Sequence, residues 1–127
     1  MSIDFKSTKG IFLQIADNIC HQILEGKLNA GDRVPSVRDL AMEYEVNRNT
    51  ILRTYSILDD MGVFDNKRGV GFFVSDDAVN IIRKKEKDEF FKNYLPDFIN
   101  KVKILKLTEE DMVELFNLIK QNSHEKE

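Results

Sequence analysis

Two arginines stand just inside two expected helix starts. Arg38 follows Ser36, and Arg48 follows Asn47. Serine and asparagine are good N-cap residues, because their side-chain oxygens accept hydrogen bonds from backbone N–H groups that the helix leaves free. An arginine near such an end can contact a phosphate, and one that enters the major groove can donate two hydrogen bonds to guanine. The spacing therefore indicates a surface that presents cations to a nucleic acid, with Arg48 as the best candidate for a base contact.

These residues also have purely structural interpretations. Arg38 could pair with Asp39 or Glu43 on its own helix, and Arg48 could be a solvated arginine at a helix end. Ser36 is primarily a cap, and any phosphate contact there would be additional. The functional interpretation of the two arginines is favoured, because both stand in the same short motif.

Periodic apolar residues predict the helices that hold these arginines. Only Glu45 and Val46 separate the end of one helix from the cap of the next, and so short a turn is typical of a helix-turn-helix. The expected buried positions are Val37, Leu40, Ala41 and Tyr44 in the first of these helices, and Ile51, Tyr55 and Leu58 in the second. An earlier helix carries Phe12, Ile15, Ile19 and Ile23 at helical spacing and stops at Gly26.

The second helix of the motif has an expected polar face. A rotation of about 100° per residue turns Asn49 and Arg53 away from the buried stripe. Thr50 lies in the first turn, where its hydroxyl could contact a phosphate or satisfy a local backbone group. Arg53 follows from helical geometry alone, so a solvated arginine is an equally good interpretation.

A hairpin with a basic tip is expected next. Gly62 supplies a helix stop, and residues 63–64 and 72–74 predict two short strands. Between them stands Lys67-Arg68-Gly69, where a glycine beside cations lets backbone and charge approach the minor groove or its phosphates. An ordinary surface hairpin is the alternative.

From residue 76 onward the pattern changes to three amphipathic helices without a strand signal. Pro96 suits the first turn of the second helix, and Thr108 with Asp111 forms a capping-box pair before the third. Because so short a segment makes a poor core of its own, a second subunit is expected to cover its apolar faces. The alternative is that these faces pack onto the N-terminal domain of the same chain. The expected domains are 1–75 and 76–127. The expected dimerisation residues are Phe90, Phe91, Phe98, Ile99, Val102, Leu105, Met112, Leu115, Phe116 and Ile119.

Composition narrows the classes of protein. The formal net charge of −3 over 127 residues argues mildly against nucleic acid, but cations are concentrated in the expected docking elements. No apolar stretch is long enough for a membrane span or a signal peptide, which predicts a cytoplasmic protein. His21 and His124 are the only histidines, and Cys20, the only cysteine, is expected to be a buried hydrophobe. We therefore expect no metal site, no cofactor and no enzymatic activity.

Residues 11–74 resemble the winged helix-turn-helix domain of the bacterial GntR transcription-factor family. The resemblance implies DNA contacts from Arg38, Asn47, Arg48, Asn49, Thr50, Arg68 and Gly69. Asn47 stands where serine or threonine is common, and Leu52 stands where some members present a DNA-facing arginine. The matching positions are Ile11-Phe12, Gln14-Ile15, Gly26, Leu28, Gly31, Pro35-Ser36, Arg38, Leu40-Ala41, Val46, Arg48-Asn49-Thr50, Tyr55, Leu58, Gly62, Gly69, Gly71 and Phe73-Val74.

The short segment after the hairpin is similar to the YtrA-like branch of that family, in which a helical tail pairs two subunits. The expectation is a mainly α-helical protein with a small β-hairpin, in which a winged helix-turn-helix domain precedes a C-terminal helical dimerisation segment. It would act as a homodimeric repressor that binds an inverted-repeat operator of double-stranded DNA. The alternative is a winged-helix adaptor that binds a protein partner, motivated by the acidic balance. The sequence identifies no small-molecule effector, operator sequence or target gene.

Overall fold

The computed structural model describes the backbone of residues 10–125 and the side chains of residues 10–122. The extreme N-terminal segment and the side chain of His124 lie outside the described residues. The chain divides into two compact units, of which the first ends at Glu86 and the second begins at Lys87.

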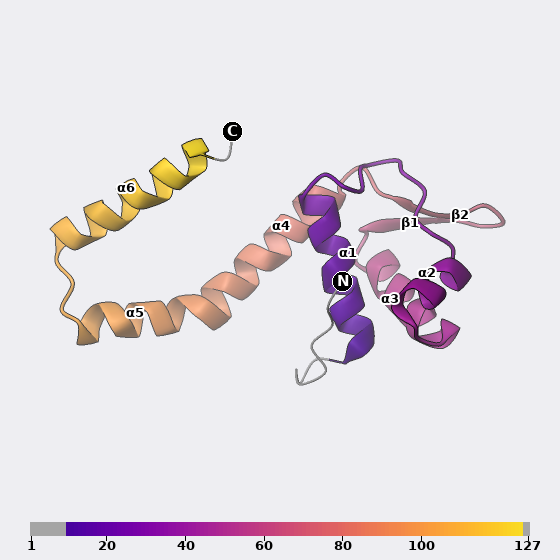
Figure 1. The fold of residues 1–127 in the computed structure, drawn as a ribbon, viewed down its shortest axis with the longest axis horizontal. Coiled ribbons are helices and arrows are strands. Elements are labelled where there is room, and N and C mark those ends of the chain that lie inside the picture. Colours follow the sequence, from indigo (N-terminus) through magenta and orange to yellow (C-terminus); the bar gives the residue numbers. More distant parts are fainter. Residues whose placement is uncertain (1–9, 126–127) are drawn as a thin grey trace. The chain divides into compact units, whose positions relative to one another are not determined.

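The protein is mainly α-helical with a two-stranded hairpin, as predicted (Figure 1). The elements in chain order are α1 (Ile11–Leu24), α2 (Val37–Tyr44), α3 (Arg48–Asp60), β1 (Phe64–Lys67), β2 (Gly71–Val74), α4 (Ala78–Glu89), a π-helical turn (Phe90–Tyr94), α5 (Leu95–Ile104) and α6 (Glu109–Glu125). Among the described residues, no helix combines the length and the apolar character that a membrane span requires.

The core of the first unit lies where α1, α2 and the hairpin pack against α3. The predicted stripe of α3 is confirmed, because Ile51, Tyr55 and Leu58 are at most 1% exposed. Ile15, Ile19 and Ile23 of α1 are buried as well, and Cys20 is a buried thiol beside them. The other buried hydrophobic residues are Ala16, Val34, Leu40, Ala41, Val63, Phe64, Val74, Ala78 and Ile82.

The first turns of α4 belong to this core. Ala78 and Ile82 are each 1% exposed and lie in the same buried cluster as α1 and α3. The compact first unit therefore runs to Glu86, beyond the expected boundary at residues 75 and 76. Helical spacing in this segment was visible in the sequence, but the partner of its apolar face was not.

The hairpin is extended by a third segment of chain. β1 and β2 pair antiparallel with Phe64 opposite Val74 and Lys67 opposite Gly71. Along the other edge of β2, the Val34 N–H donates to the Phe72 carbonyl at 3.0 Å, and an isolated bridge pairs Arg33 with Phe73. A two-stranded hairpin is marginal alone, so this third edge stabilises it.

The second unit is helical throughout its described backbone, apart from the short turn before α6. The π-helical turn leads directly into α5, without a loop between them. Pro96 occupies the first turn of α5, as predicted. Lys106 takes a left-handed conformation (φ 52°) between α5 and α6. The capping box of α6 is confirmed, because the Asp111 N–H donates to the Thr108 hydroxyl at 3.2 Å and the Thr108 N–H donates to the Asp111 carboxylate at 2.9 Å.

Candidate nucleic-acid interface

A tight turn joins α2 to α3. Glu45 adopts a left-handed conformation (φ 57°), and the Val46 N–H donates to the Ala41 carbonyl at 3.0 Å. This hydrogen bond closes the end of α2 before Asn47 begins the next helix. Two helices joined in this way form the predicted helix-turn-helix.

Both predicted caps are present. The Ser36 hydroxyl accepts from the Asp39 N–H at 3.1 Å, and the Asn47 side-chain oxygen accepts from the Thr50 N–H at 3.0 Å. The Thr50 hydroxyl also donates to that Asn47 oxygen at 3.3 Å. Ser36, Asn47 and Thr50 are therefore engaged in positioning the helix ends, and any contact with a phosphate would be added to that role.

The predicted polar residues beside the caps are exposed. Arg38, Arg48 and Asn49 all lie on the surface of the first unit. Within the described part of the chain, Arg38 forms no ion pair with Asp39 or any other carboxylate, and neither does Arg48. An arginine in the first turn also opposes the helix dipole. Arg48 is therefore an exposed cation at a helix start that does not favour its charge.

Arg53 is held by α1. Its guanidinium lies over the Phe12 ring, 3.9 Å from the ring centroid. Next to it, the buried Thr54 hydroxyl lies 2.8 Å from the Phe12 carbonyl oxygen, so α3 is tied to the start of α1. Arg53 remains on the surface, but this cation–π contact gives it a structural role that helical periodicity alone did not predict.

The hairpin tip presents the predicted cations. The Val70 N–H donates to the Lys67 carbonyl at 2.9 Å, which closes a turn in which Gly69 has a φ of 78°. Positive φ at this place favours glycine. Lys67 lies over the Phe73 ring, 4.4 Å from its centroid, while Arg68 is exposed. In this turn Lys67 is restrained by the Phe73 ring, whereas Arg68 is exposed.

Arg33 also reaches the hairpin tip, although no sequence pattern indicated this position. Its guanidinium Nη2 donates to the Val70 carbonyl at 2.6 Å across 37 residues of sequence. The segment that contains Arg33 was expected to be a loop, and neither periodicity nor a capping pattern singles it out. Only its pairing with Phe73 brings Arg33 to the hairpin tip.

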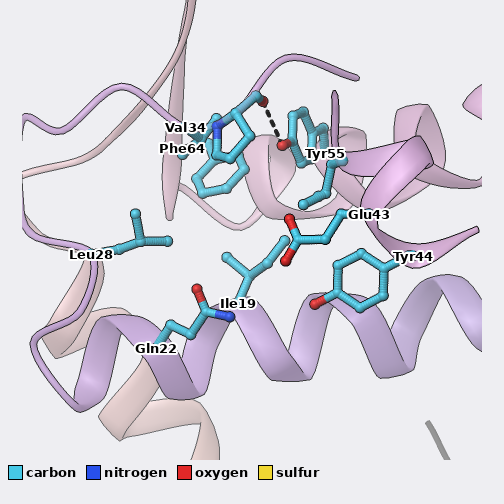
Figure 2. Close-up of a pocket in the computed structure, with 10 residues that line it drawn as sticks. Ile19, Gln22, Leu28, Val34, Glu43, Tyr44, Tyr55 and Phe64 are labelled. Atoms are coloured by element: carbon cyan, nitrogen blue, oxygen red, sulfur yellow. Dashed lines mark hydrogen bonds between the residues drawn. The ribbon is translucent and has the colours of Figure 1, made fainter. Parts of the chain in front are cut away.

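Tyr55 joins the three elements of this surface. Its hydroxyl donates to the Pro35 carbonyl at 2.7 Å, just before the cap of α2 (dashed line in Figure 2). Its ring packs edge-on against Phe64 and Phe72 of the hairpin, with centroids 5.2 Å apart in both pairs. A side chain of α3 therefore positions both the start of α2 and the hairpin.

A small hollow lies below Tyr55 (Figure 2). Its volume is about 70 Å³, roughly half that of an engineered cavity of ~150 Å³ that binds benzene. It is therefore too small for a typical effector. The residues around it are Ile19, Gln22, Leu28, Val34, Pro35, Leu40, Glu43, Tyr44, Tyr55 and Phe64.

The Tyr55→Phe variant is expected to lower the free energy of unfolding by about 1 kcal/mol, because the Pro35 carbonyl loses its donor.

Desolvation by burial also raises the pKa of Tyr55 above its ordinary value of 10.0, with a smaller contribution from Tyr44. The stability from this raised pKa is fully present below pH 10 and is lost at higher pH, because the unfolded chain loses its proton first. Urea titrations across the alkaline range should therefore show a shallower loss in Tyr55→Phe than in the wild type. Tyr94→Phe, at a 68% exposed ring, is the matched control, and equal curves for all three proteins would contradict the prediction.

A second surface, on the C-terminal helices, consists of apolar side chains. Among the predicted dimerisation residues, Val102, Met112 and Leu115 are half-buried within their own unit. The remainder are between 40% and 63% exposed, namely Phe90, Phe91, Phe98, Ile99, Leu105, Phe116 and Ile119. The structure adds exposed apolar residues that the sequence did not single out: Tyr94, Ile104, Leu107, Val113 and Leu118. So large an apolar surface is unusual for a free monomer.

A helix-turn-helix followed by a hairpin with cations at its tip defines a winged DNA-binding domain. Residues 12–74 match the family described as bacterial regulatory proteins, gntR family. The chain is 40% identical over 114 residues to the uncharacterized HTH-type transcriptional regulator YhcF of Bacillus subtilis (strain 168), covering 90% of this chain and 93% of that protein. The chain therefore belongs to the GntR family of DNA-binding transcriptional regulators, and to its short YtrA- and YhcF-like members. These proteins are regulators and not enzymes.

Two further relatives agree. The HTH-type transcriptional repressor YtrA of Bacillus subtilis (strain 168) is 35% identical over 78 residues, which is 61% of this chain and 60% of that protein. A crystal structure from Bacteroides thetaiotaomicron, assigned to a GntR-family transcriptional regulator, superposes with a TM-score of 0.75 at 35% identity, over 90% of this chain and 99% of that one. The similarity therefore includes the C-terminal helices as well as the winged domain.

Proposed function

We propose that the protein is a cytoplasmic, homodimeric repressor that binds an inverted-repeat operator. The observation that carries this proposal is the exposure of Arg38, Arg48 and Arg68 on α2, α3 and the hairpin tip. These arginines stand at two capped helix starts and at a glycine turn, without ion-pair partners in the described part of the chain. Three exposed cations on elements of this geometry suit a DNA backbone and its grooves.

Within this proposal the contacts are divided by position. Arg48, in the first turn of α3, reads a base edge in the major groove, and Asn49 lies beside it. Arg38 contacts a phosphate or a base near the start of α2. Lys67-Arg68-Gly69 contacts the minor groove or its flanking phosphates. Ser36, Asn47 and Thr50 act mainly by holding the helix ends. Arg53 contacts the DNA at the edge of this surface, and its stacking on Phe12 restricts the reach of its side chain.

Dimerisation is supported by the apolar surface of the C-terminal helices. A two-fold dimer would cover the same surface on both subunits, as closed symmetric assemblies do. It would also bring two recognition helices to half-sites about one helical turn of DNA apart. The repressor role is supported by the description of YtrA, a relative of this chain, as a transcriptional repressor.

A second candidate is a winged-helix adaptor that binds a protein and reads no DNA sequence. The observation that favours it is the net charge of −3, since a basic domain is the usual electrostatic footprint of a DNA-binding protein. A stable protein partner together with no duplex binding at low salt would support the adaptor over the repressor.

The operator can be found by selecting binding sites from random duplexes with the full chain. We expect an inverted repeat, and anisotropy titrations should show affinity that falls steeply as salt rises, because each neutralised phosphate releases counterions. A selected sequence without two-fold symmetry would contradict binding as a dimer. No preference over random duplex would overturn the proposed function altogether.

A further inference from the structure

The wing, which is the hairpin of β1 and β2, pairs along one edge with a segment that is distant in the sequence. Residues 31–34 run along the free edge of β2, where the Gly31 N–H donates to the Val74 carbonyl at 2.8 Å. The Val74 N–H donates back to the Asp32 carbonyl at 2.9 Å. This pairing fixes the backbone of Arg33 beside the hairpin, so its side chain can extend along β2 toward the tip.

The Arg33 guanidinium fills the space that Gly71 leaves. A Cβ at Gly71 would lie 3.1 Å from the Arg33 Nε and 3.3 Å from its Nη2, and the φ of Gly71 is 141°. The same guanidinium donates to the Val70 carbonyl at 2.6 Å, a hydrogen bond in which the donor carries a charge. Arg33 therefore contacts both residues that connect the tip turn to β2.

We propose that Arg33 is a positioning residue that orders the wing tip for DNA contact. Val70 is about half exposed and follows Gly69 in the turn. Without the Arg33 guanidinium, the Val70 carbonyl would lose this hydrogen bond, and the hairpin tip would sample more conformations. Ordering those conformations on binding would reduce affinity. The proposal rests on the proposed function, because it assumes that Lys67 and Arg68 contact the operator.

A direct phosphate contact by Arg33 is the competing explanation, and the two differ in a measurable way. A positioning residue acts through the tip cations, so removing those cations should abolish its effect. If Arg33 itself contacts a phosphate, Arg33→Met should still weaken binding in that background, and it should reduce the steepness of log affinity against log salt by about 0.9 for each half-site.

The test uses the full chain in four forms: wild type, Arg33→Met, Lys67→Ala/Arg68→Ala, and the combination of all three changes. Arg33→Met keeps an unbranched stem but removes the donors and the charge. Arg83→Met is the matched control, since Arg83 is exposed on α4. Affinity for the selected operator is measured by anisotropy at several salt concentrations. The amide NMR signals of Gly69 and Gly71 are followed in the free protein.

We expect Arg33→Met to shift the Gly69 and Gly71 signals and to weaken operator binding about 3- to 10-fold for each half-site, the range of one hydrogen bond per subunit. In the Lys67→Ala/Arg68→Ala background the same change should have no further effect. Equal weakening in both backgrounds, unchanged amide signals or unchanged affinity would overturn the role of Arg33. If the wild type shows no operator preference, the proposed function fails, and the amide signals still decide whether Arg33 orders the tip.

Discussion

Charge placed on the apolar surface of the C-terminal helices is expected to dissociate the proposed dimer and to weaken operator binding by about 100- to 10,000-fold. The variant is Phe91→Glu/Phe116→Glu, at side chains that are 62% and 59% exposed. Burying a carboxylate in an apolar interface is unfavourable, because its hydration is lost without a partner. Each winged domain would then bind its half-site alone, without the effective concentration that a linked second domain provides. Sedimentation equilibrium and anisotropy on the same samples measure both effects.

The matched control is Asn93→Glu/Asn117→Glu, which adds the same charge at exposed polar positions two residues after Phe91 and one residue after Phe116. It should remain dimeric and bind the operator like the wild type. Because the phenylalanines are exposed within the subunit, thermal unfolding of the winged domain should be unchanged in both variants. A wild-type protein that sediments as a monomer at micromolar concentration would contradict dimerisation, as would a Phe91→Glu/Phe116→Glu variant that remains a dimer.

Replacing Arg48 with alanine is expected to cost about 1 to 3 kcal/mol of binding free energy at each half-site and to relax specificity at one base pair. The guanidinium can donate two hydrogen bonds to guanine in a fixed geometry, which no other residue of the first turn of α3 can do. Arg48→Lys should recover affinity only in part, because a lysine offers charge without the planar pair of donors. Repeating the selection from random duplexes with the alanine variant measures the change in specificity.

Folding should be unaffected by this substitution. Asn47 still caps α3 in the Arg48→Ala variant, and removal of a cation from the first turn relieves an unfavourable interaction with the helix dipole. The free energy of unfolding should therefore stay the same or rise slightly. Arg83→Ala removes the same charge from the exposed face of α4 and should leave specificity intact. An unchanged base preference in Arg48→Ala would contradict base readout by Arg48.

Much of the winged domain could be predicted because its signals are local. Ser36 and Asn47 cap helices through backbone groups three residues away, and Gly69 takes the positive φ that its turn requires. The buried stripe of α3 follows from a period of 3.6 residues, so Ile51 and Leu58 could be placed in the core without knowing their partners. The capping box at Thr108 follows from the same kind of short spacing.

The residues that could not be predicted owe their roles to partners far away in the chain. Ala78 and Ile82 were expected in a separate helical segment, yet they complete the core of the first unit. Arg53 was expected on the polar face of α3, where a DNA contact and a solvated arginine were equally good interpretations, yet its guanidinium also stacks on Phe12. Period and capping rules give the exposed or buried side of a helix, but they do not name the element that will cover it.

The sequence by itself determined the helix-turn-helix, the position of the wing and the arginines that α2, α3 and the wing present, because caps, turns and helical faces depend on neighbours within a few residues. Only the tertiary structure decided how those parts are held together. The hydroxyl of Tyr55 reaches Pro35 across 20 residues, and the guanidinium of Arg33 reaches Val70 across 37. Contacts at such separations form only when the packed core has brought the segments together, so no local pattern encodes them.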